Sequence, residues 1–273
     1  MIQALAGTPR YFAWLYAGER MQAILTPLFG IEAEINAALA PGLEHSVAHV
    51  RTTWWAEEAQ RVRGGHALHP LTRALLAQRP AAADTGPDLS GLVDITTWDL
   101  AAATFETRTE LDGYCDRWAR AVPQVAAGLA APDLPAHLTV AFGHGLGVAL
   151  CELEMLVSLQ HAARRGRLRI PLDELAALGV APESLGHTPW PAVLCEQLRV
   201  RHQQLRIALQ ERCAQLTFPA PRTALRGLLV WAAVMQLHSR RAEHALPNAW
   251  QRSRWDGIRD ALRAWRAARR AIN

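Results

Sequence analysis

The sequence contains no lysine, so all 29 of its basic residues are arginine. We interpret this as a bias of codon composition rather than as a functional device. The formal net charge is only +4, and a charge of this size does not by itself imply a polyanionic partner. We therefore expect no nucleic-acid partner.

Cysteine is scarce, and the four cysteines lie far apart without a C-x-x-C pair: Cys115, Cys151, Cys195 and Cys213. Such spacing indicates neither a zinc site nor a disulfide framework. A reducing compartment is the simplest interpretation, so the expected location is the cytoplasm.

Long hydrophobic runs are also missing. The most apolar run, residues 228–237, is shorter than the roughly 20 residues that a bilayer requires. No basic segment followed by an apolar one opens the sequence, so we expect no secretory signal. The sequence predicts a soluble protein, with a peripheral position at the inner face of a membrane as the alternative.

Apolar residues at helical spacing are abundant. Half of the 273 residues are hydrophobic and 20% are charged, which suffices to bury a large core. The pattern predicts an all-α, single-domain protein over residues 1–273. The expected helices are 10–39 with an interruption near Pro27, 45–63, 111–129, a central apolar helix from about 143, 192–213, 223–240 and 250–272.

Three glycines occupy alternate positions of the central apolar run: Gly143, Gly145 and Gly147. Each disfavours a helix by about 1 kcal/mol relative to alanine, so another interaction must compensate. We expect close approach of a neighbouring helix or of a ligand chain.

An arginine cluster follows at Arg164, Arg165, Arg167 and Arg169. Guanidinium groups bind phosphate oxygens in a bidentate manner without a metal. Positive charge also stabilises a helix C-terminus through the helix dipole. Both interpretations stay open.

The final helix, 250–272, is basic and amphipathic, with Trp255, Ile258, Leu262 and Trp265 on one face. We expect this face to pack on the domain itself. An anionic membrane or a protein partner is the alternative.

Several of these segments resemble the squalene/phytoene synthase family, the head-to-head type of trans-isoprenyl diphosphate synthase. The family pattern R-G-R-x-x-[LI]-P followed by P-x-D-E-L matches Arg165, Gly166, Arg167, Ile170, Pro171, Asp173, Glu174 and Leu175. Two further stretches match at Trp54, Trp55, Glu57, Glu58, Gly65, His69 and Pro70, and at Leu111, Tyr114, Cys115, Ala119 and Val122. The resemblance implies an isoprenoid-synthase-type helical bundle around a central cavity, with small residues near Gly145 making room for an isoprenoid tail.

The chain departs from the family at both aspartate-rich motifs. The two aspartates of the second motif correspond to Ser158 and Ala162, and the best register for the first motif gives Glu32, Glu34 and Asn36. In the family these aspartates hold Mg²⁺, which requires carboxylate oxygens in near-octahedral geometry. We expect no cofactor, with Glu32 and Asn36 as weak metal candidates and Mg²⁺ required only if the chain is active.

The candidate substrate-binding residues come from the resemblance and from the arginine cluster. They are Arg20, Arg51, Tyr114, Arg164, Arg165 and Arg167.

Three functions are compatible with these observations. The first, which we favour, is a catalytically degenerate family member that binds a prenyl diphosphate or lipid. Relatives with eroded motifs, including mitochondrial proteins, are associated with assembly of respiratory complex I, so a membrane-surface or protein-complex partner belongs to this hypothesis. The second is an active prenyltransferase that condenses farnesyl or geranylgeranyl diphosphate head-to-head. The third is a ligand-free helical adaptor.

Overall fold

The computed structural model describes residues 5–40, 42–81, 83–101 and 104–272, and these residues contain no β-strand. The prediction of an all-α fold is confirmed. The α-helices are α1 (Pro9–Leu15), α2 (Glu19–Asn36), α3 (His45–Arg63), α4 (Pro70–Leu76), α5 (Ser90–Ala101), α6 (Arg108–Ala119), α7 (Val125–Ala130), α8 (Ala136–Val157), α9 (Leu159–Arg164), α10 (Leu172–Ala177), α11 (Ala192–Ala214), α12 (Pro219–Ala224), α13 (Arg226–Ala245) and α14 (Asp256–Ile272). Short 3-10 segments lie at η2 (Ala37–Leu39) and η4 (Pro182–Gly186), and a π-helical turn, η3 (Arg120–Gln124), joins α6 to α7.

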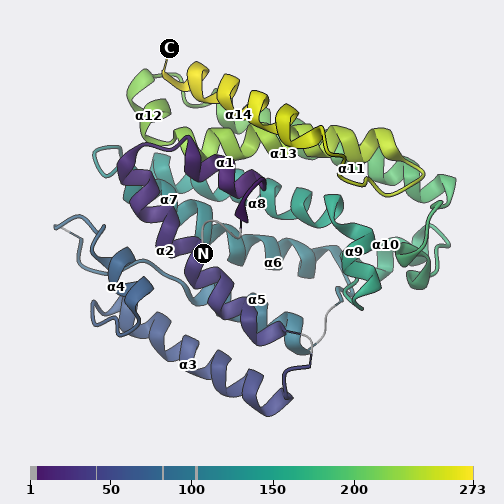
Figure 1. Cartoon of the computed structure of the whole chain (residues 1–273). Coiled ribbons are helices and arrows are strands. Elements are labelled where there is room, and N and C mark those ends of the chain that lie inside the picture. Colours follow the sequence, from purple (N-terminus) through teal and green to yellow (C-terminus); the bar gives the residue numbers. More distant parts are fainter. Residues whose placement is uncertain (1–4, 41, 82, 102–103, 273) are drawn as a thin grey trace.

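Helix α8 runs through the middle of the bundle (Figure 1). It packs against α6, η3 and α7 on one side and against α11 and α13 on the other. Helix α13 packs against α14 and α1. Helix α14 lies at one edge of the molecule, whereas α3 and α4 lie at the opposite edge (Figure 1). Helices α8 and α13 therefore connect the two halves of the bundle.

The N-terminal helical segment breaks at a different place from the one predicted. Helix α2 continues through Pro27, and the interruption lies at Gly18, whose backbone is extended. The expected break near Pro27 is wrong, because the helix on both sides of the proline is held by buried residues such as Leu25 and Leu28.

Helix α8 is long and apolar enough to cross a bilayer by length and composition alone, but 61% of its most apolar window is buried inside the protein. This longest apolar helix is thus a core helix. The most apolar run of the sequence, residues 228–237, lies instead in α13.

The central glycines of α8 allow close helix packing. A Cβ atom at Gly143 would lie 2.7 Å from the Cα of Gln124, and one at Gly147 would lie 2.7 Å from the Cβ of Ala119. Both neighbours belong to the α6–η3 segment. A close neighbouring helix, not an isoprenoid tail, therefore fills the space beside these two glycines.

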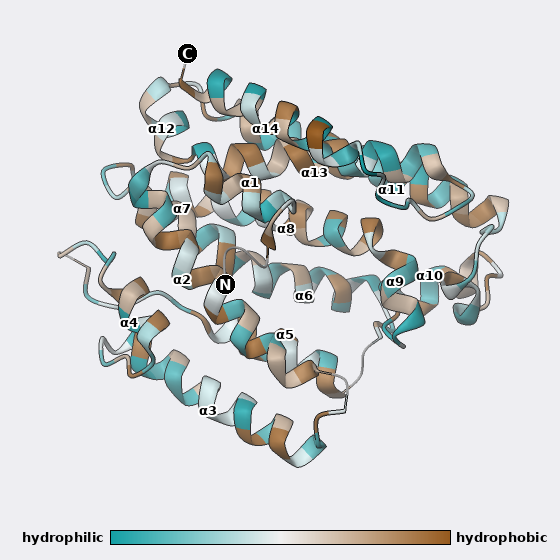
Figure 2. Ribbon diagram, in the orientation of Figure 1, coloured by the Kyte–Doolittle hydropathy of each residue, from teal (hydrophilic) through white to brown (hydrophobic). Residues whose placement is uncertain are grey.

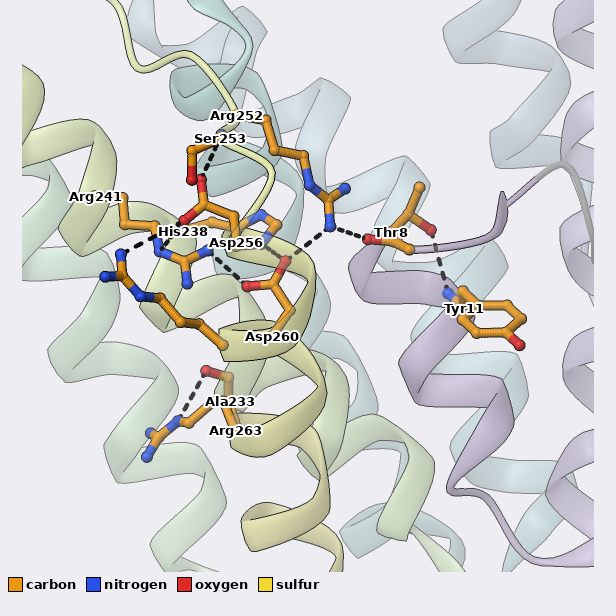
Figure 3. A network of polar contacts seen from close by, with 12 residues as sticks. Thr8, Tyr11, Ala233, His238, Arg241, Arg252, Ser253, Asp256, Asp260 and Arg263 are labelled. Atoms are coloured by element: carbon orange, nitrogen blue, oxygen red, sulfur yellow. Dashed lines mark hydrogen bonds and ion pairs between the residues drawn. The ribbon is translucent and has the colours of Figure 1, made fainter.

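The C-terminal helix is anchored to α13 by a buried carboxylate, Asp260 (Figure 3). Asp260 Oδ2 lies 3.0 Å from His238 Nε2 and accepts a hydrogen bond of 3.0 Å from Arg252 Nη2. Arg241 Nη1 donates to Asp260 Oδ1 at 2.6 Å. Arg252 also donates to the carbonyl of Gly7 at 2.6 Å, so this network ties α14, α13 and the N-terminal segment together.

The residues with which α14 packs on α13 are small, chiefly Ala264, Ala268 and Ala271. Its large apolar side chains are exposed instead. In Figure 2 hydrophobic and hydrophilic residues alternate along this outer helix. The expectation that Trp255, Ile258, Leu262 and Trp265 pack on the domain is therefore wrong. The buried acidic network and the alanines hold the helix in place instead.

The glycine contacts predict a position-specific effect of alanine. Gly143→Ala and Gly147→Ala should each destabilise the protein by roughly 1–3 kcal/mol, because the new methyl group overlaps neighbouring atoms. Gly145→Ala is the matched control, since the three atoms nearest to its Cβ would all belong to the Arg212 side chain, which can move. Denaturant unfolding followed by circular dichroism measures the three free energies, and equal values for all three variants would contradict the packing described.

Burial of a histidine between α11 and α13 predicts a dependence of stability on pH. His202 is buried, its Nδ1 lies 2.9 Å from Ser239 Oγ, and burial together with nearby Arg206 lowers its pKa to about 4. In the unfolded chain the pKa is about 6.5, so between these values only the unfolded chain binds the proton. The free energy of unfolding should fall by up to about 3 kcal/mol as the pH decreases through this window.

Replacing His202 with Asn removes the titrating group while keeping a polar atom near Ser239. Unfolding titrations of both proteins at several pH values test the assignment. The variant should show a smaller slope between about pH 6.5 and pH 4. An identical slope in both proteins would exclude His202 as the source.

Candidate functional site

A pocket of about 440 Å³ lies where α2, α5, α6, α8 and α9 meet. Its size is within the usual range for small-molecule sites. The residues that line it are Arg10, Glu32, Asn36, Leu39, Ala40, Ile95, Asp99, Tyr114, Trp118, Cys151, Glu154, Met155, Ser158, His161, Ala162, Arg165, Arg167 and Arg169.

One wall of this pocket is built around the guanidinium group of Arg10, which α1 supplies. It forms ion pairs with Glu32 of α2 and, at 2.7 Å between Nη2 and Oε2, with Glu154 of α8. Trp118 Nε1 donates to Glu32 at 2.8 Å, and Trp231 Nε1 donates to Glu154 at 3.1 Å. Both carboxylates are therefore already engaged by protein donors.

Aromatic rings surround the same guanidinium group. Its central carbon lies 5.2–5.8 Å from the ring centroids of Phe29, Trp118 and Trp231, within the range of cation–π interactions. Burial alone would lower the pKa of Arg10, but the charges of Glu154 and Glu32 outweigh burial and raise it. The group is a permanent, fixed cation.

A second ion pair lies at the α5–α6 side of the pocket. Arg169 donates to Asp99 Oδ2 at 2.8 Å, and the hydroxyl of Tyr114 donates to the same oxygen at 3.1 Å. Burial, reinforced by the charge of Asp99, raises the pKa of Tyr114 well above its usual value, so the phenol stays neutral. Arg167 lies farther from this carboxylate, at 3.8 Å.

The positions of the missing family aspartates lie on the wall of this pocket. Ser158 and Ala162 both line it, and the hydroxyl of Ser158 donates to the carbonyl of Glu154 at 2.7 Å. Glu32 and Asn36 line the same pocket, and the side-chain oxygen of Asn36 accepts a hydrogen bond of 3.2 Å from Thr96.

These side chains do not fit a magnesium centre. Glu32 and Glu154 are held by Arg10, Asp99 is held by Arg169, and Ala162 offers no oxygen in its side chain. Within the described part of the chain, no group of three or more His, Cys, Asp or Glu side chains could hold a metal ion. A divalent cation would have to displace a guanidinium group to reach the two glutamates.

Cations that are less engaged lie near the end of α9. Arg165 is exposed, and its side chain makes no hydrogen bond or ion pair with the other described residues. Gly166 has a φ of +75°, which permits the turn that separates Arg165 from Arg167. His161, one helical turn before Arg165, is also exposed. These groups are available to an anionic ligand.

The structure brings together only part of the predicted set. Tyr114, Arg165 and Arg167 line the pocket together with Ser158, Ala162, Glu32 and Asn36. Three other candidates lie outside its lining. Arg20 donates to the carbonyl of Leu129 at 2.8 Å, Arg164 donates to the carbonyl of Gly186 at 2.9 Å, and Arg51 is exposed on α3.

Sequence reasoning missed Arg10, Asp99 and Trp231 as part of this region. Arg10 belongs to none of the matched motifs, and no local pattern connects it to Glu154, which lies 144 residues later. Glu154 offered a weak signal, because it stands one helical turn before Ser158.

The contacts of Arg10 predict that a variant without this arginine gains stability from a divalent metal ion. Arg10→Ala leaves two carboxylates side by side without a cation and should destabilise the protein by about 3 kcal/mol or more. Mg²⁺ or Mn²⁺ should raise the melting temperature of this variant, since an ion can enter between Glu32 and Glu154, but not that of the unmodified protein. The matched control adds Glu32→Gln and Glu154→Gln to Arg10→Ala and should lose the response. An equal metal-induced shift in the unmodified protein would show that Arg10 does not block the site.

Known proteins show the same architecture. A dehydrosqualene synthase whose crystal structure holds a ligand matches with a TM-score of 0.74 at 14% sequence identity, over 98% of this chain and 95% of that chain. The squalene synthase HpnC from Alicyclobacillus acidocaldarius matches with a TM-score of 0.52 at 14% identity, over 96% of this chain and 88% of that chain. At this identity the two structures establish the fold, so the predicted isoprenoid-synthase-type bundle is confirmed.

No curated protein sequence matches the chain closely enough to serve as a relative. The sequence model of the squalene/phytoene synthase family does match, over residues 7–264. Because this match covers nearly the whole sequence, the chain belongs to the squalene/phytoene synthase family.

Proposed function

We propose that this protein is a catalytically degenerate member of its family that binds a phosphate-bearing isoprenoid or lipid without a metal. The observation that carries the proposal is the Arg10 guanidinium group between Glu32 and Glu154. It places a fixed cation against the only pair of glutamates that line the pocket among the described residues.

The loss of metal ligands argues against head-to-head condensation. Ionisation of an allylic diphosphate requires stabilisation of the departing pyrophosphate, and a metal ion supplies several kcal/mol of it. Each ~1.4 kcal/mol corresponds to a tenfold change in rate. Arg10 does not replace this contribution, because two carboxylates already neutralise its charge.

Binding of an anionic head group does not need that stabilisation. The ionic groups deep in the pocket are paired with one another, whereas Arg165 has no partner among the described residues and Arg167 has only a long contact of 3.8 Å with Asp99. We assign the phosphate groups to Arg165 and Arg167, with His161 beside them. Guanidinium groups suit this task, since each offers two parallel donors to phosphate oxygens.

The hydrocarbon part of the ligand has less room than expected, because the space that the sequence predicts for an isoprenoid tail beside the α8 glycines is filled. Residues of α6 and η3 fill the space beside Gly143 and Gly147. The pocket itself has a small apolar portion formed by Leu39, Ile95 and Met155. We therefore assign only the head group and the first carbons of the ligand to the pocket.

A binding role of this kind is compatible with action in the assembly of a membrane complex, such as a respiratory complex, from a cytoplasmic position at the inner face of the membrane. The competing proposal is an active prenyltransferase, for which Mg²⁺ would be the cofactor. Similarity to a dehydrosqualene synthase concerns the fold and does not favour this alternative over binding.

Calorimetric titration distinguishes these functions. Farnesyl diphosphate and inorganic pyrophosphate should bind in the presence of EDTA, with an affinity that Mg²⁺ does not increase and without release of pyrophosphate from the prenyl ligand. Glycerol 3-phosphate, as the head group of a phospholipid, tests whether the preferred ligand is a diphosphate or a lipid.

Arg165→Gln combined with Arg167→Gln should weaken binding at least tenfold, because charge-assisted hydrogen bonds contribute about 1.5–3 kcal/mol each. Arg51→Gln combined with Arg164→Gln is the matched control, since both residues lie outside the pocket lining, and it should keep the affinity. Mg²⁺-dependent binding with turnover would establish an active enzyme, and absence of all binding would favour a ligand-free adaptor.

A further inference from the structure

The outward face of α14 carries several large apolar side chains that are exposed. Ile258 is 63% exposed, Leu262 and Trp265 are each 44% exposed, and Ile272 is 51% exposed. Trp255, directly before the helix, is 56% exposed. Ala264, Ala268 and Ala271, by contrast, are buried against the rest of the protein. The helix thus turns its small residues inward and its large ones outward.

The same face is strongly basic. Six arginines accompany the apolar side chains, and the only acidic residues of the helix, Asp256 and Asp260, are buried against α13. Figure 3 shows that the carboxylate of Asp260 is already bound by His238, Arg241 and Arg252. The arginines are Arg254, Arg259, Arg263, Arg266, Arg269 and Arg270.

Part of the positive charge of these arginines is not balanced by nearby carboxylates. Arg263 lies near Arg240, Arg266 and Arg270, and burial together with these positive neighbours lowers its pKa below the usual arginine value. None of these four arginines forms an ion pair with another residue in the described ranges, whereas Arg241 nearby pairs with Asp256 and Asp260. A group of adjacent cations without carboxylates attracts an anionic surface.

Arginine and tryptophan are also paired along the helix. The guanidinium carbon of Arg254 lies 5.2 Å from the ring centroid of Trp255, and that of Arg269 lies 5.1 Å from that of Trp265. In such pairs the flat ring can enter the boundary between head groups and acyl chains while the cation stays with the head groups.

We propose that the outward face of α14, from Trp255 to Ile272, docks this protein on an anionic phospholipid membrane. The apolar side chains enter the head-group boundary, and the flanking arginines bind lipid phosphates. The helix lies flat rather than crossing the bilayer.

A membrane suits this face better than an acidic protein does. The helix is a straight ridge of about 26 Å at the outer edge of the molecule, with nothing above it in Figure 1 or Figure 2. Four of its arginines, Arg259, Arg263, Arg266 and Arg270, form a stripe along one flank of the apolar residues, an arrangement typical of a helix that lies in a membrane interface. A flat, deformable anionic surface accepts both kinds of side chain along the whole ridge.

The acidic network beneath the helix would transmit this attachment to the whole protein. Asp260 joins α14 to α13, and Arg252 extends the connection to Gly7, close to α1. Docking is independent of the ligand proposed for the pocket, because no residue of the α14 face lines that pocket.

Flotation of the full-length protein with lipid vesicles tests the proposal. The protein should float with vesicles of phosphatidylcholine and phosphatidylglycerol, should not float with phosphatidylcholine alone, and should dissociate as salt is raised. Ile258→Ser combined with Trp265→Ser should weaken binding at least tenfold. Arg266→Gln combined with Arg270→Gln should weaken it roughly 25-fold, because each arginine near an anionic surface contributes about fivefold.

Matched controls lie on α3, at the opposite edge of the molecule (Figure 1). Val47→Ser combined with Val50→Ser, and Arg51→Gln combined with Arg63→Gln, remove the same kinds of exposed groups and should leave flotation unchanged. The pocket variant Arg165→Gln with Arg167→Gln should also float normally, which separates this proposal from the function of the pocket.

Circular dichroism confirms that each variant is folded. Equal binding to neutral vesicles, or unchanged binding of both α14 variants, would overturn the proposal. Absence of vesicle binding combined with α14-dependent binding of an acidic protein would assign the face to a protein partner instead.

Discussion

The ion pairs of Arg10 with Glu32 and Glu154 are the interaction on which the pocket depends. They join three helices that are distant in sequence, α1, α2 and α8, at one buried point. Because the two carboxylates would repel one another without a cation, the guanidinium group is needed for the fold as well as for the shape of the pocket. Three aromatic rings surround the guanidinium group, so the Arg10 side chain has little freedom to move.

This arrangement separates the fold of the family from its chemistry. An isoprenoid-synthase bundle keeps its helices together by apolar packing, which the chain retains through α8 and the glycines that let α6 approach it. Metal-dependent chemistry needs free carboxylates, and the pocket has none to offer while Arg10 and Arg169 occupy them. The function we propose for this scaffold is to hold an anion at Arg165 and Arg167.

Charge is distributed in two separate places that serve different purposes. Deep in the pocket, Arg10 and Arg169 are paired with carboxylates at short distances. On α14, by contrast, both acidic residues face inward, so the outer side carries arginines alone among its charged groups. The membrane we propose for this face and the ligand we propose for the pocket would contact different surfaces of one helical bundle.

The sequence by itself determined the helical class, the family and several helix bounds. Residues 45–63 form the predicted helix because apolar spacing and the following Gly64 and Gly65 are local signals. It also located Ser158, Ala162, Arg165 and Arg167, whose spacing along one segment brings them to one pocket wall.

Only the tertiary structure decided the role of Arg10 and the direction of the α14 face. Pairing between residues 144 apart leaves no periodic trace. An amphipathic pattern reveals that a helix has two faces. Which face of α14 turned inward was decided by the packing of its own alanines and by the ion pair of its buried Asp260 with Arg241.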